Sequence, residues 1–158
     1  MAKQVSAEAL WQFSLALYPK VQPLCLQWQD NFGVNVNLLL LLCYLEQQQL
    51  SLTSPQLQQL AAQLSDFSGQ FTQPLRTLRR NSVNAKLSAT QQRYLKQALL
   101  QAELSLEQLE QQLLLEYCPP LTASVQPLIE LYLTKLNVND LLHTAQINDL
   151  RQALQQLG

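Results

Sequence analysis

Leucine recurs along residues 89–116 in alternating steps of four and three, and this rhythm constrains the fold more than any other feature of the chain. The positions in this leucine stripe are Leu95, Leu99, Ala102, Leu106, Leu109 and Leu113. Heptad spacing of this kind places apolar side chains on one face of a helix that packs against another helix. Ser88 and Gln91 have the spacing of a capping box at its start, and Cys118-Pro119-Pro120 ends it. The sequence therefore predicts one long helix near residues 89–116.

The same helix has a second apolar strip, formed by Leu100, Leu104, Leu114 and Leu115. Two strips are wider than the contact face for a single neighbour. The width predicts contact either with two neighbouring helices or with one neighbour and a second subunit, which would be a homodimer formed through the leucine stripe.

The composition extends the helical prediction to the whole chain. Leucine supplies most of the apolar residues, glutamine takes most of the polar positions, and there are only three glycines. Leucine, glutamine, alanine and glutamate favour helices, whereas strands favour β-branched and aromatic residues. We therefore expect an all-α fold, a single-domain bundle of about seven or eight helices over residues 1–158.

Capping residues and prolines divide the chain into these helices. The expected approximate ranges are 6–19, 21–32, 36–48, 54–65, 66–82, 89–116, 122–136 and 140–157. The helix over 36–48 is apolar all round in its first two turns, so we expect it at the centre. Pro74 falls inside the helix over 66–82, which either bends there or starts anew. The bend is favoured because it leaves the following arginines near the negative end of the helix.

The strongest functional signal is a run of basic residues. Six of the ten Lys and Arg residues, and none of the eleven Asp and Glu residues, lie between positions 67 and 102. They are Arg76, Arg79, Arg80, Lys86, Arg93 and Lys96. The three arginines have i, i+3, i+4 spacing and share one helix face, where guanidinium groups suit phosphate or carboxylate. The segment is the candidate site for an anion or an acidic partner.

A structural alternative remains open for the arginines, because carboxylates elsewhere in the chain can fold back onto them. The candidates for such internal ion pairs are Asp30, Asp66, Glu103 and Glu107. Nucleic acid is a weaker expectation, since the pI is about 5.7 and only Tyr94 is interleaved with the basic residues.

A second candidate region lies on the first three helices, where Trp11, Tyr18, Trp28 and Tyr44 fall at helical spacing. Aromatic residues so placed usually form core, but polar residues beside them can floor a small pocket. The pocket candidates are Trp11, Tyr18, Gln29, Asp30 and Asn37. A small anionic ligand between these helices and the arginine helix is the alternative function.

Catalytic and metal-binding patterns are weak. His143 is the only histidine, and no GxSxG motif, glycine-rich phosphate loop or Asp-rich cluster accompanies it. Glu103, Glu107 and Glu110 share a helix face, but no second carboxylate motif answers them. The sequence disfavours an enzyme and predicts no metal and no cofactor.

Location follows from the cysteines and the hydrophobic segments. Cys25, Cys43 and Cys118 are odd in number and widely spaced, as expected of buried thiols in a reducing cytoplasm. The run Leu38 to Leu45 is far shorter than the roughly 20 apolar residues that span a bilayer. The start MAKQVSAEAL does not read as a signal peptide. We expect a cytoplasmic protein with no membrane contact.

A series of short words then resembles a known family. In order they are Trp11-x-Phe13-Ser14-Leu15-x-Leu17-Tyr18, Cys25-Leu26-Gln27-Trp28-Gln29-Asp30, Gly33-Val34-Asn35-Val36-Asn37-Leu38-Leu39, Pro74-Leu75-Arg76-x-x-Arg79-Arg80 and Ala102-Glu103. The series resembles an uncharacterised family of small, all-helical proteobacterial proteins, a domain of unknown function, over about residues 6–110. This chain departs at Asn35, where the family pattern often has Asp, and at Tyr44 and Phe67, where it often has Trp. The resemblance implies a fold and a location but no activity.

These observations leave two functions. The favoured one is a non-catalytic module that binds an acidic or protein partner through the basic surface from Arg76 to Lys96. The other is a small-molecule site, enzymatic or not, for an anionic ligand.

Overall fold

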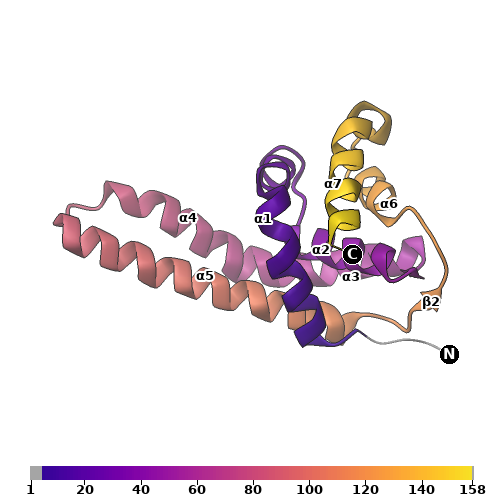
Figure 1. Cartoon of the computed structure of the whole chain (residues 1–158). Helices are drawn as coiled ribbons and strands as arrows, with labels where there is room; N and C mark the ends of the chain where they lie inside the picture. Colours follow the sequence, from indigo (N-terminus) through magenta and orange to yellow (C-terminus); the bar gives the residue numbers. More distant parts are fainter. Residues whose placement is uncertain (1–4, 158) are drawn as a thin grey trace.

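The computed structural model describes residues 5–157, except for the side chain of Asp140. In chain order the elements are α1 (Ala7–Phe32), α2 (Val36–Gln47), β1 (Leu50–Ser51), α3 (Ser54–Phe67), η1 (Ser68–Thr72), α4 (Gln73–Asn81), η2 (Ser82–Asn84), α5 (Ala89–Tyr117), β2 (Thr122–Ala123), α6 (Leu128–Lys135), η3 (Asp140–His143) and α7 (Thr144–Gln156). The expected all-α class is confirmed (Figure 1). Because α3, η1 and α4 follow one another without a break, the described residues form six helical segments, slightly fewer than expected.

Helix α1 is a single helix where the sequence predicts two. Pro19 and Pro23 both lie inside it, and each removes a backbone donor at a cost of about 3 kcal/mol in a helix interior. Both prolines are on the exposed side, so water can reach the carbonyls that lose their partners. The opposite face stays buried from Leu10 to Trp28. Burial of this face holds the helix together across the predicted boundary, although it changes direction in its middle (Figure 1). The predicted ends are confirmed, with Ser6 as N-cap and a left-handed Gly33 at the C-cap.

Helix α2 is central, as its sequence predicts. Asn35 caps it, and every residue from Asn37 to Cys43 is buried. The helix packs against α1, α5 and α6, so that it has neighbours on all sides. This arrangement explains the absence of a polar face.

The segment that contains Pro74 is helical from Ser54 to Asn81, so the boundary predicted at Asp66 is wrong. Its N-cap is Thr53, in a capping box with Gln56, rather than Ser54. A π-helical turn, η1, ends just before Pro74, and there Gln73 N–H bonds to the Ser68 carbonyl five residues back. Such a turn changes the hydrogen-bond pattern in the region where proline cannot donate, which lets the helix continue. The arginines therefore follow the proline within one helical path, as the favoured interpretation expects.

Helices α4 and α5 form a hairpin whose outer part stands clear of the other helices (Figure 1). The predicted capping box of Ser88 and Gln91 starts α5, which is 29 residues long. We call residues 73–102 the arm. No residue of the arm is buried. Its two helices cover each other on one side only.

The leucine stripe is not the buried face of α5. The buried residues of this helix are Glu103, Glu110, Gln111 and Leu114. In the predicted stripe, Leu95 and Leu99 are half-buried, and Leu109 is exposed. Heptad leucine spacing located the helix correctly, but three of its four buried residues are polar, and the fourth, Leu114, comes from the second apolar strip.

The C-terminal part differs from expectation at its start. Residues 122–127 are not helical, because Thr122–Ala123 pairs antiparallel with Leu50–Ser51 and α6 begins only at Leu128, after Pro127. The last predicted helix is split into η3 and α7, with Asn139 Oδ1 accepting from Leu141 N at 3.0 Å. None of the helices described is both long and apolar enough to cross a membrane.

Candidate functional site

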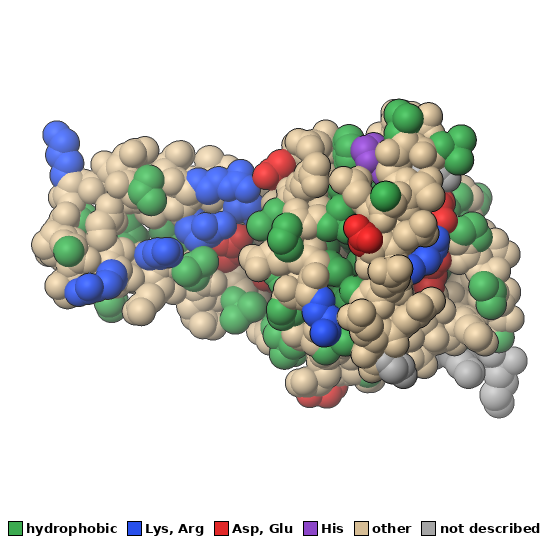
Figure 2. Space-filling model, turned by 45° about the horizontal axis from the view of Figure 1, so that its top comes forward, with side chains coloured by type: hydrophobic (Ala, Val, Ile, Leu, Met, Phe, Trp, Pro, Cys, Tyr) green, Lys and Arg blue, Asp and Glu red, His purple; other side chains and the backbone are tan. Residues whose placement is uncertain are grey.

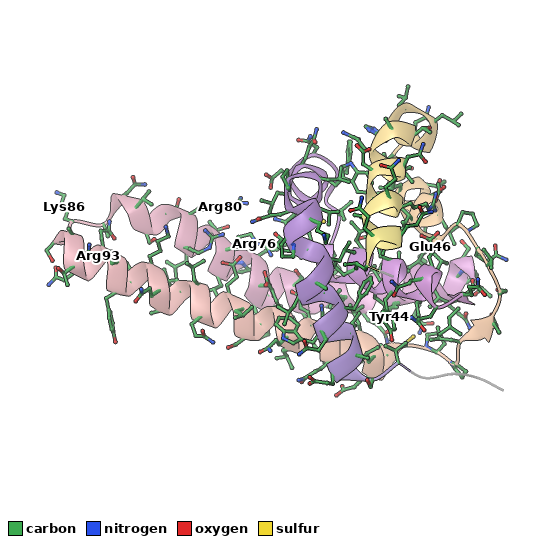
Figure 3. All side chains as sticks on the ribbon, viewed as in Figure 1. Tyr44, Glu46, Arg76, Arg80, Lys86 and Arg93 are labelled. Atoms are coloured by element: carbon green, nitrogen blue, oxygen red, sulfur yellow. The ribbon has the colours of Figure 1, made fainter. Side chains whose placement is uncertain are left out.

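The six basic candidates all lie on the arm. Arg76, Arg79 and Arg80 come from α4, Lys86 from the connection, and Arg93 and Lys96 from α5. Lys and Arg side chains gather on one side of the arm (Figure 2). Lys86 and Arg93 lie near the tip, whereas Arg76 and Arg80 lie near the base beside α1 (Figure 3). We call this surface the basic face.

Two of the arginines meet a carboxylate of the chain itself. Arg76 Nε donates to Glu103 Oε1 at 3.2 Å, and Arg79 Nε donates to Glu103 Oε2 at 2.5 Å. The Glu103 side chain is only 10% exposed, so the three groups form a partly buried ion-pair cluster. These two bonds use only Nε of each guanidinium, and among the described residues the terminal nitrogens of Arg76 and Arg79 hold no hydrogen bond. Of the candidate carboxylates, Glu103 is therefore the partner of Arg76 and Arg79.

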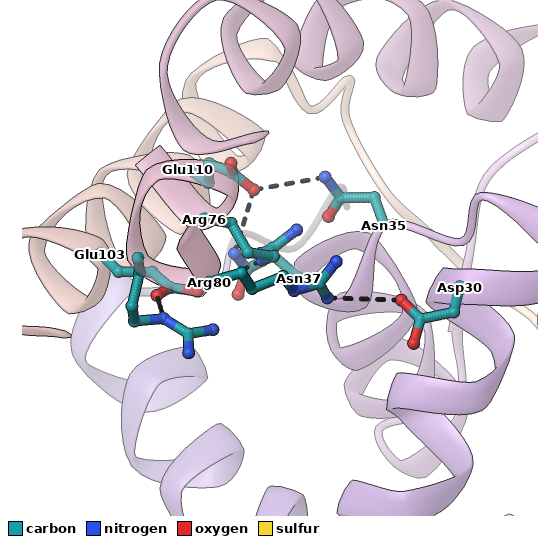
Figure 4. A network of polar contacts seen from close by, with 8 residues as sticks. Asp30, Asn35, Asn37, Arg76, Arg80, Glu103 and Glu110 are labelled. Atoms are coloured by element: carbon teal, nitrogen blue, oxygen red, sulfur yellow. Dashed lines mark hydrogen bonds and ion pairs between the residues drawn. The ribbon is translucent and has the colours of Figure 1, made fainter. Parts of the chain in front are cut away.

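The third arginine has a weaker partner. Arg80 Nη2 lies 3.5 Å from Asp30 Oδ1 at the end of α1, and both side chains are more than half exposed (Figure 4). An exposed pair of this kind contributes little to stability. It joins α1 to the base of the arm.

The remaining cations carry the uncompensated charge. Lys86, Arg93 and Lys96 are exposed, and within the described part of the chain none of them forms an ion pair. No Asp or Glu lies between positions 67 and 102. The outer arm is therefore the most positive part of the surface that the structure describes.

A buried polar layer lies beneath the arm, between α1, α2 and α5. Glu110 Oε1 accepts from Asn37 Nδ2 at 3.1 Å and from Asn35 Nδ2 at 3.3 Å (Figure 4). Gln111 Nε2 donates to Ser14 Oγ at 2.9 Å and to Asn37 Oδ1 at 3.2 Å. Glu110 Oε2 and Gln111 Oε1 have no partner in the described structure. These contacts place polar groups where the leucine stripe predicts apolar ones.

Asn35 has two roles in this layer. Its Oδ1 caps α2 through Leu38 N at 3.0 Å, while its amide donates to Glu110. An aspartate at this position could cap the helix equally well, but it would set a second carboxylate against Glu110. The asparagine therefore suits the buried carboxylate next to it.

Electrostatics at the junction of arm and α1 centre on Glu107. Its pKa is raised to about 7 by burial and by Glu103, an effect that nearby Arg76 only partly offsets. The pKa of Tyr18 is also raised, mainly by burial. A carboxyl that titrates near neutrality thus sits between the ion-pair cluster and the polar layer.

The five pocket candidates have different neighbours in the described structure. Tyr18 lies near Arg76 and Glu107, Asp30 pairs with Arg80, and Asn37 belongs to the polar layer. Trp11 and Gln29 are half-buried, and neither has a hydrogen bond from its side chain among the described residues. Trp28, also on α1, is fully buried and donates from Nε1 to Gln146 Oε1 at 3.3 Å. The aromatic residues of the first helices are mainly core.

The arm has two shallow hollows on a second side. Leu78 and Leu99 border one, Leu87 and Tyr94 border the other, and Leu95 is shared by both. Every residue that lines them is uncharged. The side that holds the hollows, which we call the uncharged face, therefore differs in chemistry from the basic face.

Groups that could perform nucleophilic chemistry are held in inactive surroundings. The ring of His143 packs on Phe32, and its Nδ1 lies 2.9 Å from Gln146 Oε1. Burial raises the pKa of the Cys25 thiol to about 12 and that of Cys118 to about 11. Among the described residues, no group of three or more His, Cys, Asp or Glu side chains is placed to hold a metal ion.

One ionic cluster is not predicted by any pattern in the sequence. Arg151 on α7 donates from Nη2 to Glu130 Oε1 at 2.5 Å and to Glu46 Oε1 at 2.8 Å. At Glu130 the burial that raises the pKa is outweighed by Arg151, so the pKa falls; at Glu46 burial prevails and the pKa rises. The three residues lie on α2, α6 and α7 and are far apart in sequence, so no local pattern could reveal them.

Comparison with known proteins agrees with the resemblance noted from the motifs. A family model described as a protein of unknown function (DUF2390) matches residues 9–114, which is more than half of the chain. No curated protein and no solved structure matches. The matched range includes α1, α2, the arm and the polar layer. The chain therefore belongs to the DUF2390 family of proteins of unknown function.

Proposed function

We propose that this protein is a non-catalytic interaction module that binds an acidic protein partner through the basic face of the arm, from Arg76 to Lys96. The observation that carries the proposal is a group of three exposed cations, Lys86, Arg93 and Lys96, which form no ion pair with any described residue and lie on an arm that buries none of its residues. Like charges gathered on one surface repel each other unless an anion binds among them. An acidic partner removes this repulsion.

The internal ion pairs shift the centre of the proposed surface outward. Glu103 neutralises about one of the two charges of Arg76 and Arg79, so these residues belong to the scaffold at the base. The charge available to a partner lies mainly at the three outer cations and at Arg80, whose pair with Asp30 is exposed.

The proposal is tested by binding of fluorescein-labelled poly-L-glutamate at low ionic strength. We expect Arg93→Gln/Lys96→Gln to weaken binding by about tenfold, the sum of two exposed charge contacts, and added salt to reduce the difference. The matched control is Lys20→Gln/Lys135→Gln, which makes the same change of net charge on α1 and α6. Equal loss of binding in both double variants would show non-specific attraction and would contradict the proposal.

A small anionic ligand at the base of the arm is the second candidate. The observation that favours it is the set of terminal guanidinium nitrogens of Arg76 and Arg79, which hold no hydrogen bonds to the described residues. Arg76 also lies near Tyr18. A thermal-shift screen with phosphorylated and carboxylate metabolites tests it. A stabilisation that Arg76→Gln abolishes would support this site, and no shift with any compound would count against it.

The proposal includes a cytoplasmic location. It rests on the sequence, where three cysteines are odd in number and widely spaced.

A further inference from the structure

One stripe of α5 passes from the interior of the protein to the surface of the arm. Its members follow steps of three and four: Arg93, Lys96, Leu100, Glu103, Glu107, Glu110 and Leu114. Residues at this spacing lie along one face of a helix. The inner half is covered, since Glu103, Glu110 and Leu114 are each at most 7% exposed. The outer half is open, since Arg93 and Lys96 are exposed and Leu100 is 41% exposed.

Helices of the protein itself cover the inner half. Asn35 and Asn37, before and within α2, bond to Glu110, and Tyr18 of α1 lies near Glu107. In Figure 1, α1 crosses the hairpin at its base, and the arm continues beyond it with no helix on that side. A two-helix layer is stable when a further element covers its apolar strip. Only the outer half of the stripe, which lies on the arm, lacks such an element.

The contacts at the edge of α1 indicate what such an element would need. Asp30, at the end of α1, already reaches Arg80 with a carboxylate. On α5, Leu100 and Leu104 are 41% and 40% exposed. Farther out along the stripe, toward the tip of the arm, lie Lys96 and Arg93. A cover for this surface therefore needs an apolar ridge near α1 and carboxylates toward the tip.

We propose that the acidic partner supplies an amphipathic α-helix that lies on the arm beside α1. This inference rests on the proposed function and specifies its partner. The apolar side of the helix contacts Leu100 and Leu104, and its carboxylates pair with Lys96, Arg93 and Lys86. From Arg93 to Leu104 the surface is about 17 Å long, so a helix of roughly 12 residues covers it.

Charge decides between this occupant and a second copy of the chain. The arm carries six basic and no acidic residues, so the basic faces of two arms repel each other. An acidic helix is attracted to the same surface. A second copy on the basic face is therefore an outcome of the test and not the proposal.

The test uses three synthetic peptides of about 16 residues, two acidic and one neutral, each long enough for four helical turns. The first places leucines at heptad spacing and glutamates elsewhere, the second shuffles the same residues, and the third replaces each glutamate by glutamine. Fluorescence anisotropy with the full chain gives their affinities, and circular dichroism gives the helix content on binding. We expect tight, helical binding by the first peptide only.

Variants of the chain locate the site. Leu100→Gln is expected to weaken the first peptide about fivefold, because roughly half of a leucine side chain leaves the contact. The matched control is Tyr94→Gln, an exposed aromatic on the uncharged face of α5, which should leave the affinity unchanged. Both positions are exposed, and the circular dichroism of the free variants verifies that they fold.

The outcomes separate this inference from the function on which it rests. One adverse result is a shuffled peptide that binds as tightly as the amphipathic one, and another is an affinity that Leu100→Gln leaves unchanged. Either result would contradict a helical partner segment and leave the proposal of an acidic partner in place. If none of the acidic peptides and no poly-L-glutamate binds, both proposals are overturned. A doubling of molar mass that depends on Leu100 and needs no peptide would assign the surface to a second copy.

Discussion

Glu103 on α5 accepts a hydrogen bond from Arg79 Nε on α4 at 2.5 Å, and its other oxygen accepts from Arg76. One carboxylate thus holds two guanidinium groups at the place where the arm leaves the rest of the protein. The arrangement fixes α4 to α5 just before the two helices project outward. It also neutralises about one of the two charges that these arginines bring to the basic face.

Glu103→Gln should destabilise the protein. The substitution leaves two partly buried guanidiniums without their counter-charge, and we expect a loss of about 2–3 kcal/mol in the free energy of unfolding. Urea unfolding at neutral pH measures it. Glu116→Gln, at an exposed position on the same helix without an ion pair, is the matched control and should change stability by less than about 0.5 kcal/mol. Equal stability of the two variants would show that the cluster contributes nothing.

Glu107 should make stability depend on pH near neutrality. Its folded-state pKa of about 7 lies above the ordinary 4.5, so the folded chain binds more protons than the unfolded chain between these values. The contribution is complete below pH 4.5 and is lost as the pH rises toward 7. Glu107→Gln, which stays neutral, should flatten this decline and be more stable than the wild type at pH 8. Unfolding curves at several pH values measure the effect, and an unchanged slope in the variant would exclude Glu107 as its source.

Arg151→Met should destabilise the packing of α7. Glu46 and Glu130 would lose their shared counter-charge in a partly buried setting, at a cost of about 2–4 kcal/mol. Adding Glu46→Gln and Glu130→Gln should restore much of the loss, because the uncompensated carboxylates are then gone. Thermal unfolding of the single and triple variants makes the comparison. A triple variant no more stable than the single one would show that packing by the arginine stem matters more than its charge.

The three thiols should be unreactive in the folded protein. Cys25 and Cys43 are buried, burial raises the pKa of both, and half-buried Cys118 has a pKa of about 11. Since the thiolate is the reactive form, a disulfide reagent at pH 8 should react slowly with the native chain and rapidly in denaturant. A fast-reacting thiol in the native protein would contradict the placement of that cysteine.

The wide apolar surface of α5 leaves two alternatives, and the first, contact with two neighbouring helices, agrees with the contacts of α5 to α1, α2, α3 and α4. The second, a homodimer through the leucine stripe, stays a prediction. Ala102 and Leu109 are exposed, so these two positions of the stripe are open to a second subunit. Light scattering over a range of concentrations should give the mass of a dimer for the wild type. Leu109→Glu should give a monomer, while Gln108→Glu adds the same charge next to the stripe and should stay dimeric. A wild-type protein that remains monomeric at every concentration would contradict this prediction.

Local patterns in the sequence located most of the helices. Ser6, Gly33, Asn35 and the Ser88–Gln91 box mark helix ends in the structure as they do in the sequence. They succeed because a cap is a contact between residues a few positions apart. The prolines of α1 misled the prediction, because the cost of a missing donor is local while the burial that outweighs it comes from distant helices.

In the candidate site, too, local features could be predicted from the sequence and contacts between distant helices could not. The basic segment and the shared face of its arginines could be found from spacing alone, and so could the candidacy of Glu103. The sequence could not show which carboxylates pair with the arginines, because Glu103 and Asp30 are distant from them in sequence. Only the packing of α5 and α1 against α4 brings these carboxylates to the arginines. The polar layer around Glu110 was hidden for a related reason, since the leucines of α5 suggested that its buried face was apolar.

By itself, the sequence determined that the chain is helical, where its central helix lies and that six of its ten Lys and Arg residues fall in one segment without Asp or Glu. These properties depend on composition and on spacings within one or two turns. Only the tertiary structure decided that Glu103 holds two arginines while Lys86, Arg93 and Lys96 form no ion pair within the described part of the chain. The reason is that ion pairing depends on distances between helices, which the chain order does not fix.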